Sequence, residues 1–225
     1  MVDIRKSGKA PPSAEQTRAA LVRAALAQFG ARGFDGASTR DIAAAAGANI
    51  GSIAYHFGGK EGLRTACAQF IVDTIQEIAG RALAADGGGP RNADEATAAL
   101  NAALERMVTF IVAQPEAGEI VQFVLRELSQ PTAALDAIYK GVFEPTHRRL
   151  CEVWSMATGE PADSERTKLT VFTLIGQVVY FRIGREAVKR RMGWSDIGIA
   201  EATAVAGVAS DNLAAILTAR KGAKT

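Results

Sequence analysis

The residues that could do chemistry in this 225-residue chain gather in residues 38–63, with the sequence STRDIAAAAGANIGSIAYHFGGKEGL. Hydroxyl, phenol, imidazole and ammonium groups donate hydrogen bonds to phosphate oxygens, whereas groups at the start of a helix in the major groove reach base edges. We expect phosphate contacts from Thr39, Tyr55, His56 and Lys60. The residues expected near base edges are Arg40, Ile50, Gly51, Ser52 and, as a second role, Tyr55.

These side chains need two short helices to position them. The helices meet across Gly47-Ala48-Asn49, and a three-to-four-residue turn containing glycine is typical of a helix-turn-helix. Ile53 and Phe57, four residues apart, are expected to face inward. Asn49 is expected to cap the second helix, whose first amides would then point at an anion. The pattern predicts helix 49–57 in a DNA major groove; the alternative is a helical hairpin whose Tyr and His cap a core.

The charge distribution favours the same end of the chain. Residues 1–64 hold nine Lys/Arg and five Asp/Glu, a net +4, whereas residues 65–225 hold 17 and 19, a net −2. A basic segment on a body that is not basic suggests an anionic partner, nucleic acid first. The composition, 48% hydrophobic and 22% charged, excludes wholesale disorder. Cys67 and Cys151 are too few for a disulfide framework and fit a reducing cytoplasm.

The rest of the chain also predicts helices, so the fold class is all-α. Pro145 is expected to kink or split one helix. The longest apolar run without charge, residues 169–181, is 13 residues long, which is shorter than the roughly 20 of a membrane-spanning helix. The expected helices lie at about 14–32, 38–46, 49–57, 60–85, 92–112, 116–129, 132–157, 163–190 and 197–219.

Residues 14–75 resemble the DNA-binding domain of the TetR/AcrR family of bacterial regulators. The matching stretches are Ala24-Ala25-Leu26 with Phe29, Gly33-Phe34, Ser38-Thr39-Arg40-Asp41-Ile42-Ala43, Ala46-Gly47 and Phe57-Gly58-Gly59-Lys60-Glu61. Ala54 stands where many members carry a tyrosine. Stretches further on, such as Cys67-Ala68-Gln69, Arg126 to Ala134, Ile175-Gly176-Gln177, Phe181 to Glu186 and Gly193-Trp194, are similar to the CecR-like subgroup. The resemblance implies an all-helical homodimer with a ligand-sensing C-terminal domain, and repression of nearby genes, often those for efflux or detoxification.

The expected domains are a flexible basic arm at 1–13, a three-helix DNA-binding domain at 14–75 with its motif at about 38–57, and a larger ligand-sensing and dimerisation domain at 76–225. Arg126 lies in an apolar segment and needs a partner: Glu119, Glu127 or an anionic ligand group. An apolar pocket with a few polar groups would suit a small molecule, and plain core packing is the alternative. The candidate ligand-binding residues are Phe123, Arg126, Tyr139, His147, Gln177 and Tyr180.

Other chemistries find no support in the sequence. No P-loop, HExxH or Ser-His-Asp order is present, so we expect no enzyme and no cofactor. His147 and Cys151 share a helix face and could be half a zinc site, but the only other His and Cys are His56 and Cys67, so no metal site is expected. The helix at 171–181 is apolar nearly all round, which favours burial of one face against a twin helix, with help from 197–219, over a monomer core.

The sequence therefore predicts a cytoplasmic, homodimeric repressor, without a membrane segment, that binds a palindromic double-stranded DNA operator. A small-molecule inducer of unknown identity would release it, with helix 60–85 as the lever between the domains. The alternative is a DNA-binding regulator or architectural protein that senses no ligand.

Overall fold

The structure, a computed structural model, describes residues 13–83 and 89–221. Within these ranges it is helical with no strand, which confirms the all-α prediction. Two of the segments are π-helical turns, η1 and η2. The elements in chain order are α1 (Ala14–Gly36), α2 (Thr39–Ala45), α3 (Gly51–Phe57), α4 (Lys60–Leu83), α5 (Ala93–Val108), η1 (Thr109–Ala113), α6 (Pro115–Ser129), α7 (Ala133–Ile138), η2 (Tyr139–Phe143), α8 (Glu144–Thr158), α9 (Glu165–Ile183), α10 (Arg185–Met192) and α11 (Ile199–Lys221).

Side-chain caps fix the helix starts where the sequence predicts them. Ser13 and Gln16 form a reciprocal capping box: the Ser13 amide donates to Gln16 Oε1 at 2.9 Å, and the Gln16 amide donates to Ser13 Oγ at 3.2 Å. The Ser38 hydroxyl accepts from the Asp41 amide, and Asn92 Oδ1 accepts from the Glu95 amide. Each cap satisfies an amide that has no partner within its own helix.

One of the expected long helices is broken and another contains a π turn. The helix expected at 163–190 is two, because α9 ends and α10 begins on either side of Gly184. The helix expected at 132–157 runs without a gap through α7, η2 and α8, with Pro145 in the first turn of α8. Proline has no N–H, so the carbonyl four residues earlier, that of Gly141, has lost its helical donor. Gln76 Nε2 of α4 donates to that carbonyl at 2.9 Å.

The connection from α5 to α6 differs, because Gln114 has a ψ of 129° and the helix ends at the π turn η1. Pro115 then begins α6, at the first helical position where its missing N–H costs nothing. The carbonyl of Ile111, near the end of η1, accepts a hydrogen bond from Arg182 Nε of α9. At both π turns a side chain from another helix therefore satisfies a carbonyl.

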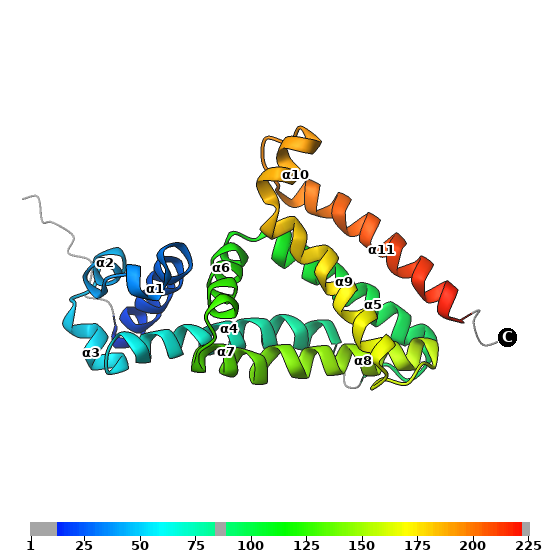
Figure 1. Cartoon of the computed structure of the whole chain (residues 1–225), viewed down its shortest axis with the longest axis horizontal. Helices are drawn as coiled ribbons and strands as arrows, with labels where there is room; N and C mark the ends of the chain where they lie inside the picture. Colours follow the sequence, from blue (N-terminus) through cyan, green and yellow to red (C-terminus); the bar gives the residue numbers. More distant parts are fainter. Residues whose placement is uncertain (1–12, 84–88, 222–225) are drawn as a thin grey trace, which may run out of the picture.

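The helices pack around two separate hydrophobic cores. In Figure 1, α1–α3 lie at one end, α4 runs along the molecule beside α7 and α8, and α6 stands between α1 and the α5–α9 pair. The first core joins α1–α3 and the first half of α4 to residues of α6 and α7, so it spans both sides of the predicted domain boundary at residue 75. The second core joins α5, η1, α8, α9 and α11.

Phe123 of α6 belongs to the first core. Its side chain is 1% exposed, and its ring centroid lies 6.4 Å from that of Phe29 in α1. The two helices approach closely at Gly30, where a Cβ would lie 3.1 Å from the Cβ of Gln122. A buried aromatic side chain held between two helices has a packing role, and the structure gives it no access to solvent.

Two stretches, Ala93–Ala113 and Ile199–Arg220, are long and apolar enough to span a membrane by length and composition alone. Both carry a buried stripe at helical spacing that packs in the second core, and core helices commonly pass such a test. We interpret them as core helices. The stripes are Ala96, Leu100, Leu104 and Val108 on the first, and Ala202, Val205, Ala209, Leu213 and Leu217 on the second.

The packing of Phe123 gives a stability prediction. Phe123→Ala should lower the free energy of unfolding by about 3–5 kcal/mol, because it leaves a cavity between α1 and α6. Tyr139, an exposed aromatic residue, is the control, and Tyr139→Ala should change stability by no more than about 0.5 kcal/mol. Chemical denaturation of both variants measures the difference; equal values would contradict this placement of Phe123.

Candidate nucleic-acid interface

Helices α2 and α3 form the predicted helix-turn-helix. Gly47 between them has φ of 63°, a left-handed conformation that suits glycine. Asn49 Oδ1 accepts from the Gly51 amide at 2.9 Å, so the Asn49 side chain holds the start of α3. Ile53 is buried and Phe57 is packed against the first core, as the four-residue spacing predicts. Gly58, with φ of 71°, ends α3.

The outer side of α3 is exposed. Tyr55 is 82% exposed and Ile50 is 50% exposed, although both are large. The Tyr55 and His56 rings pack edge to face with centroids 4.9 Å apart. Of the other predicted residues, Arg40, Asn49 and Gly51 are exposed, and Thr39, Ser52, His56 and Lys60 are half-buried. All nine lie on α2, α3, the turn between them or the first residue of α4.

Aromatic rings hold three cations around this motif. The Lys60 ammonium lies 4.4 Å from the Phe34 ring centroid, and the Arg64 guanidinium lies 4.4 Å from the same ring. The Arg18 guanidinium lies 5.4 Å from the Phe57 ring. These pairs could not be predicted from the sequence, because their members are far apart along the chain and no local pattern joins them.

The charge of the motif is left largely unneutralised. Arg32 forms an ion pair with Asp41 at 3.2 Å, where both side chains are about half exposed. Arg18, Arg40 and Lys60 form no ion pair with any described residue. Exposed cations beside a helix with large exposed side chains suit contact with a phosphate backbone.

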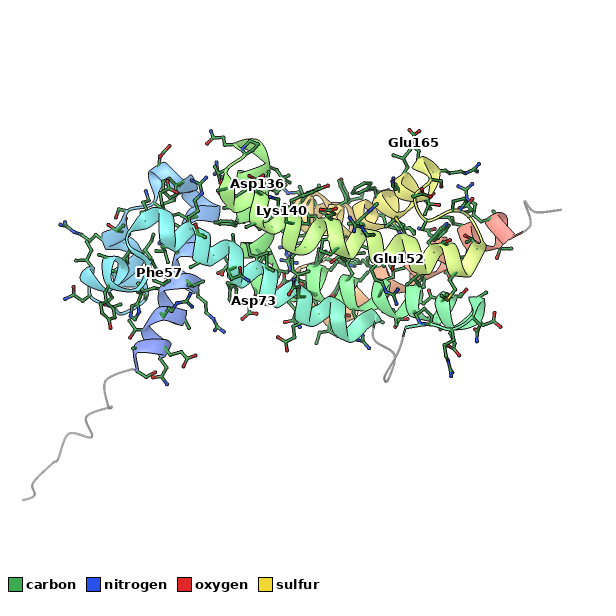
Figure 2. The ribbon with its side chains drawn as sticks, turned by 90° about the horizontal axis from the view of Figure 1, so that it is seen from below. Phe57, Asp73, Asp136, Lys140, Glu152 and Glu165 are labelled. Atoms are coloured by element: carbon green, nitrogen blue, oxygen red, sulfur yellow. The ribbon has the colours of Figure 1, made fainter. Side chains whose placement is uncertain are left out.

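Gly62 sets how close α3 lies to α4. A Cβ at this position would lie 1.8 Å from the carbonyl oxygen of Phe57, the last residue of α3. In Figure 2 Phe57 marks this end of the molecule, and Glu165 lies towards the opposite end. Any side chain at Gly62 would push the backbone of α3 away from α4. Gly62 is therefore a positioning residue, and no local sequence pattern indicates this role.

The six candidate ligand-binding residues do not come together in one cavity. Phe123 and Arg126 of α6 contact α1, whereas Tyr139 and Tyr180 are exposed on η2 and α9. The His147 ring stacks on that of Phe172 with centroids 4.0 Å apart, and its Nε2 lies 3.1 Å from the Lys168 carbonyl oxygen. Gln177 Oε1 accepts from Asn212 Nδ2 at 3.3 Å.

Arg126 forms an ion pair with neither Glu119 nor Glu127. Its Nε donates to the carbonyl of Gly30 at 3.3 Å, and one of its terminal nitrogens donates to the carbonyl of Ala31 at 3.2 Å. These carbonyls precede Gly33, where the chain of α1 kinks. A guanidinium at the end of a helix satisfies free carbonyls and complements the helix dipole.

The described hollows lie elsewhere. An apolar cavity of about 50 Å³ lies in the second core between α5, α8, α9 and α11, and an open hollow of about 560 Å³ lies between the start of α9 and the end of α11. None of the six candidates lines either. The cavity is lined by Leu100, Ala103, Leu104, Met107, Leu150, Val171, Leu174, Ile175 and Leu213, and the hollow by Glu165, Arg166, Leu169, Thr170, Thr173 and Arg220.

The two thiols are structural rather than reactive. Burial raises the pKa of the Cys67 thiol to about 12, and burial also raises the pKa of Cys151. Cys151 Sγ lies 3.7 Å from His147 Nδ1. Among the described residues, no three His, Cys, Asp or Glu side chains gather as metal ligands would.

The contact at Gly62 yields a prediction with an internal control. Gly62→Ala should destabilise the protein by about 1–3 kcal/mol, since its methyl group would overlap the backbone of α3. At Gly51 a Cβ would lie 3.4 Å from its nearest neighbour, Asn49 Oδ1, so Gly51→Ala should be neutral or stabilising. Thermal unfolding of both proteins tests this, and a Gly62→Ala variant as stable as Gly51→Ala would refute the close approach.

Comparison with known proteins agrees with this geometry. Residues 21–67 match the family of bacterial regulatory proteins called the tetR family, and residues 96–220 match the C-terminal domain of the HTH-type transcriptional dual regulator CecR. The chain is 37% identical over 184 residues to the protein of that name from Shigella flexneri, covering 80% of this chain and 82% of the relative.

Solved structures share the fold. A TetR-like transcriptional regulator from Rhodococcus sp. RHA1 superposes with a TM-score of 0.63 at 20% identity, covering 91% of this chain and 98% of that one. AibR in complex with isovaleryl coenzyme A and operator DNA superposes with a TM-score of 0.59 at 18% identity, covering 74% of this chain and 85% of that one. The chain therefore belongs to the TetR family of transcriptional regulators, with a helix-turn-helix DNA-binding domain and a C-terminal domain of the CecR type.

Proposed function

We propose that the chain is a cytoplasmic homodimeric repressor that binds a palindromic operator and leaves it when a small molecule binds. The observation that carries the proposal is the exposed outer side of α3, where Tyr55 and Ile50 face solvent. Arg18, Arg40 and Lys60 lie nearby and form no ion pair with any described residue. Large exposed side chains on a short helix are expected where the helix enters a groove.

Some of the proposed contacts are to the DNA phosphate backbone and others are to the bases. Thr39, Tyr55, His56 and Lys60 would hold phosphates, and Arg18, near α3, would add one more cation. The side chains of Arg40, Ile50 and Ser52, with the backbone of Gly51, would reach base edges. Asn49 would hold the first turn of α3 in place through its bond to the Gly51 amide. The Ser52 and Ile53 amides donate to the carbonyls of Asn49 and Ile50, so side chains rather than free amides would make the contacts at this end of α3.

The proposed dimer interface is the outer face of α9 and α11. Exposed apolar residues recur on it, including Leu169, Phe172, Tyr180 and Ile183 on α9 and Val208 on α11. Gly176 and Gly207 lie in the middle of these helices, where a Cβ would meet nothing within 4 Å. A glycine inside a helix costs about 1 kcal/mol relative to alanine. Packing within one chain does not explain these glycines, whereas close approach of a second copy would.

Support for the ligand comes from a fold neighbour. AibR, of the same fold, was solved in complex with isovaleryl coenzyme A and operator DNA. In this chain the cavity of about 50 Å³ in the second core is smaller than the few hundred Å³ of a typical ligand pocket. A ligand bound in this cavity would have to widen it, which would couple binding to a change of shape. We propose that the regulated genes serve efflux or detoxification. Screening compounds for release of the protein from DNA would identify the inducer.

The same small cavity favours a second candidate, a DNA-binding regulator without an inducer. The two candidates differ in one respect: compounds should release the first protein from DNA and leave the second bound. Activation at some promoters is a further outcome to test, since the Shigella flexneri relative is named a dual regulator.

Fluorescence anisotropy on DNA from upstream of the chain's own gene tests the proposal. At about 150 mM salt with excess nonspecific competitor, we expect tight binding with two protomers per site. Lys60→Ala should weaken binding to every sequence. It should also reduce the slope of log affinity against log salt concentration by about one. Lys140→Ala, which removes an exposed lysine on η2, is the control and should bind like the wild type. Binding abolished by competitor would contradict sequence-specific recognition at this site.

The dimer interface has its own test. Gly207→Glu places a charge on the face of α11 and should yield a species with the 23.6 kDa mass of one chain in light scattering after gel filtration. Ala98→Glu, at an exposed helical position on α5, should stay dimeric. A dimeric Gly207→Glu protein would exclude this face.

A further inference from the structure

The two hydrophobic cores do not follow the order of the helices along the chain. Residues of α6 and α7, including Ile120, Phe123, Ala134 and Ile138, are buried in one core with α1–α3 and the first half of α4. The helices that precede and follow them, α5 and α8, are buried in the other core. Two helices from the C-terminal part of the chain thus pack as part of the DNA-binding end.

The backbones of α1 and α6 approach each other closely at Gly30. At Gly30 a Cβ would lie 3.3 Å from the backbone nitrogen of Phe123 and 3.5 Å from the carbonyl oxygen of Glu119. Helices this close cannot slide past each other without large side-chain rearrangement. Arg126 then fixes the end of the contact, with its two hydrogen bonds to the carbonyls of Gly30 and Ala31.

A nearly buried ion pair joins α6 to α4 in the same region. Arg64 Nε donates to Glu127 Oε1 at 2.9 Å, and a second guanidinium nitrogen of Arg64 donates to Glu127 Oε2 at 3.3 Å. The Glu127 and Arg64 side chains are 6% and 12% exposed. Glu127 also accepts from the hydroxyl of Thr132, which caps α7. This fork-shaped pairing fixes the geometry of α4, α6 and α7 together.

The chain crosses between the two cores at two places where the helix is irregular. It passes from α5 to α6 through η1, an extended Gln114 and Pro115, and from α7 to α8 through η2 and Pro145, where the helix continues. At both crossings a π turn and a proline interrupt the regular helical hydrogen bonding. Such interruptions are where a chain bends at low cost.

We propose that α6 and α7 move with α1–α3 and the first half of α4 as one rigid DNA-reading body, and that Arg126 and Glu127 are positioning residues for recognition helix α3. The second body consists of α5 and α8–α11, and the two bodies hinge at Pro115, Pro145 and the part of α4 between the cores. The role in DNA binding rests on the proposed function, whereas the existence of the two bodies does not.

The bodies are tested without DNA. Native-state hydrogen exchange of the full chain, followed by mass spectrometry in rising guanidinium chloride, resolves units that open together. We expect peptides from residues 115–138 to open in the same step as those from residues 14–72, and separately from those of α5 and α8. Opening of residues 115–138 with α5 and α8, or a single step for all helices, would overturn the proposal.

The positioning role is tested with an operator selected from random DNA on the wild-type protein. Arg126→Ala should bind the two-half-site operator about tenfold more weakly, the effect of losing a hydrogen bond from a charged donor. Its affinity for the same DNA with one half-site scrambled should be unchanged, because one α3 can still dock alone. Arg148→Ala, which removes an exposed arginine on α8, is the matched control and should behave like the wild type at both sites.

The outcomes separate the two proposals. Equal weakening of Arg126→Ala at the full and scrambled sites would mean loss of structure rather than of spacing, and wild-type affinity at both would mean no role; either overturns the positioning role. Glu127→Gln gives a second, independent variant at the neighbouring contact and should show the same selective loss. Failure of the wild-type protein to select any operator would count against the proposed function, while the exchange experiment would still decide whether the two bodies exist.

Discussion

The architecture depends on two prolines, which have no backbone N–H to donate. Pro115 and Pro145 each follow a π turn. At Pro115 the helix ends, since Gln114 has a ψ of 129°, and the chain turns so that α6 packs against α1. At Pro145 the helix instead continues from α7 through η2 into α8, with α7 in the first core and α8 in the second (Figure 1). Arg182 and Gln76 bind the carbonyls of Ile111 and Gly141, so both interruptions are anchored.

This constraint changes the role expected of α4. Helix 60–85 is the obvious lever in the sequence because it directly follows the helix-turn-helix. In the structure α4 shares the connection with α6, which is held at both ends. At its start, Arg182 donates to the carbonyls of Ile111 and Gln114, and at its end Arg126 donates to those of Gly30 and Ala31. Burial lowers the pKa of Arg182, but an arginine remains charged near neutral pH.

The sequence allowed prediction of features that depend on neighbouring residues. Caps at Ser13, Ser38 and Asn92 and the inward position of Ile53 follow from spacings of three or four residues. Features that join distant residues could not be predicted in this way. Arg126 was recognised as a charge needing a partner, but its partners lie 96 and 95 residues away. For the same reason no local pattern showed that Phe123 packs on Phe29 or that Gly62 meets the carbonyl of Phe57.

The positions of these anchors suggest how a ligand and DNA would oppose each other. The small cavity lies between α5, α8, α9 and α11, and α9 carries Arg182. A ligand that widened the cavity would move α9 relative to α5, and Arg182 would carry that movement to the start of α6. Because α6 is packed against α1 at backbone distance, the displacement would reach α3 rather than dissipate in side-chain rearrangement. DNA that holds two copies of α3 at a fixed spacing would resist the same movement, so each ligand would weaken the other by the same factor.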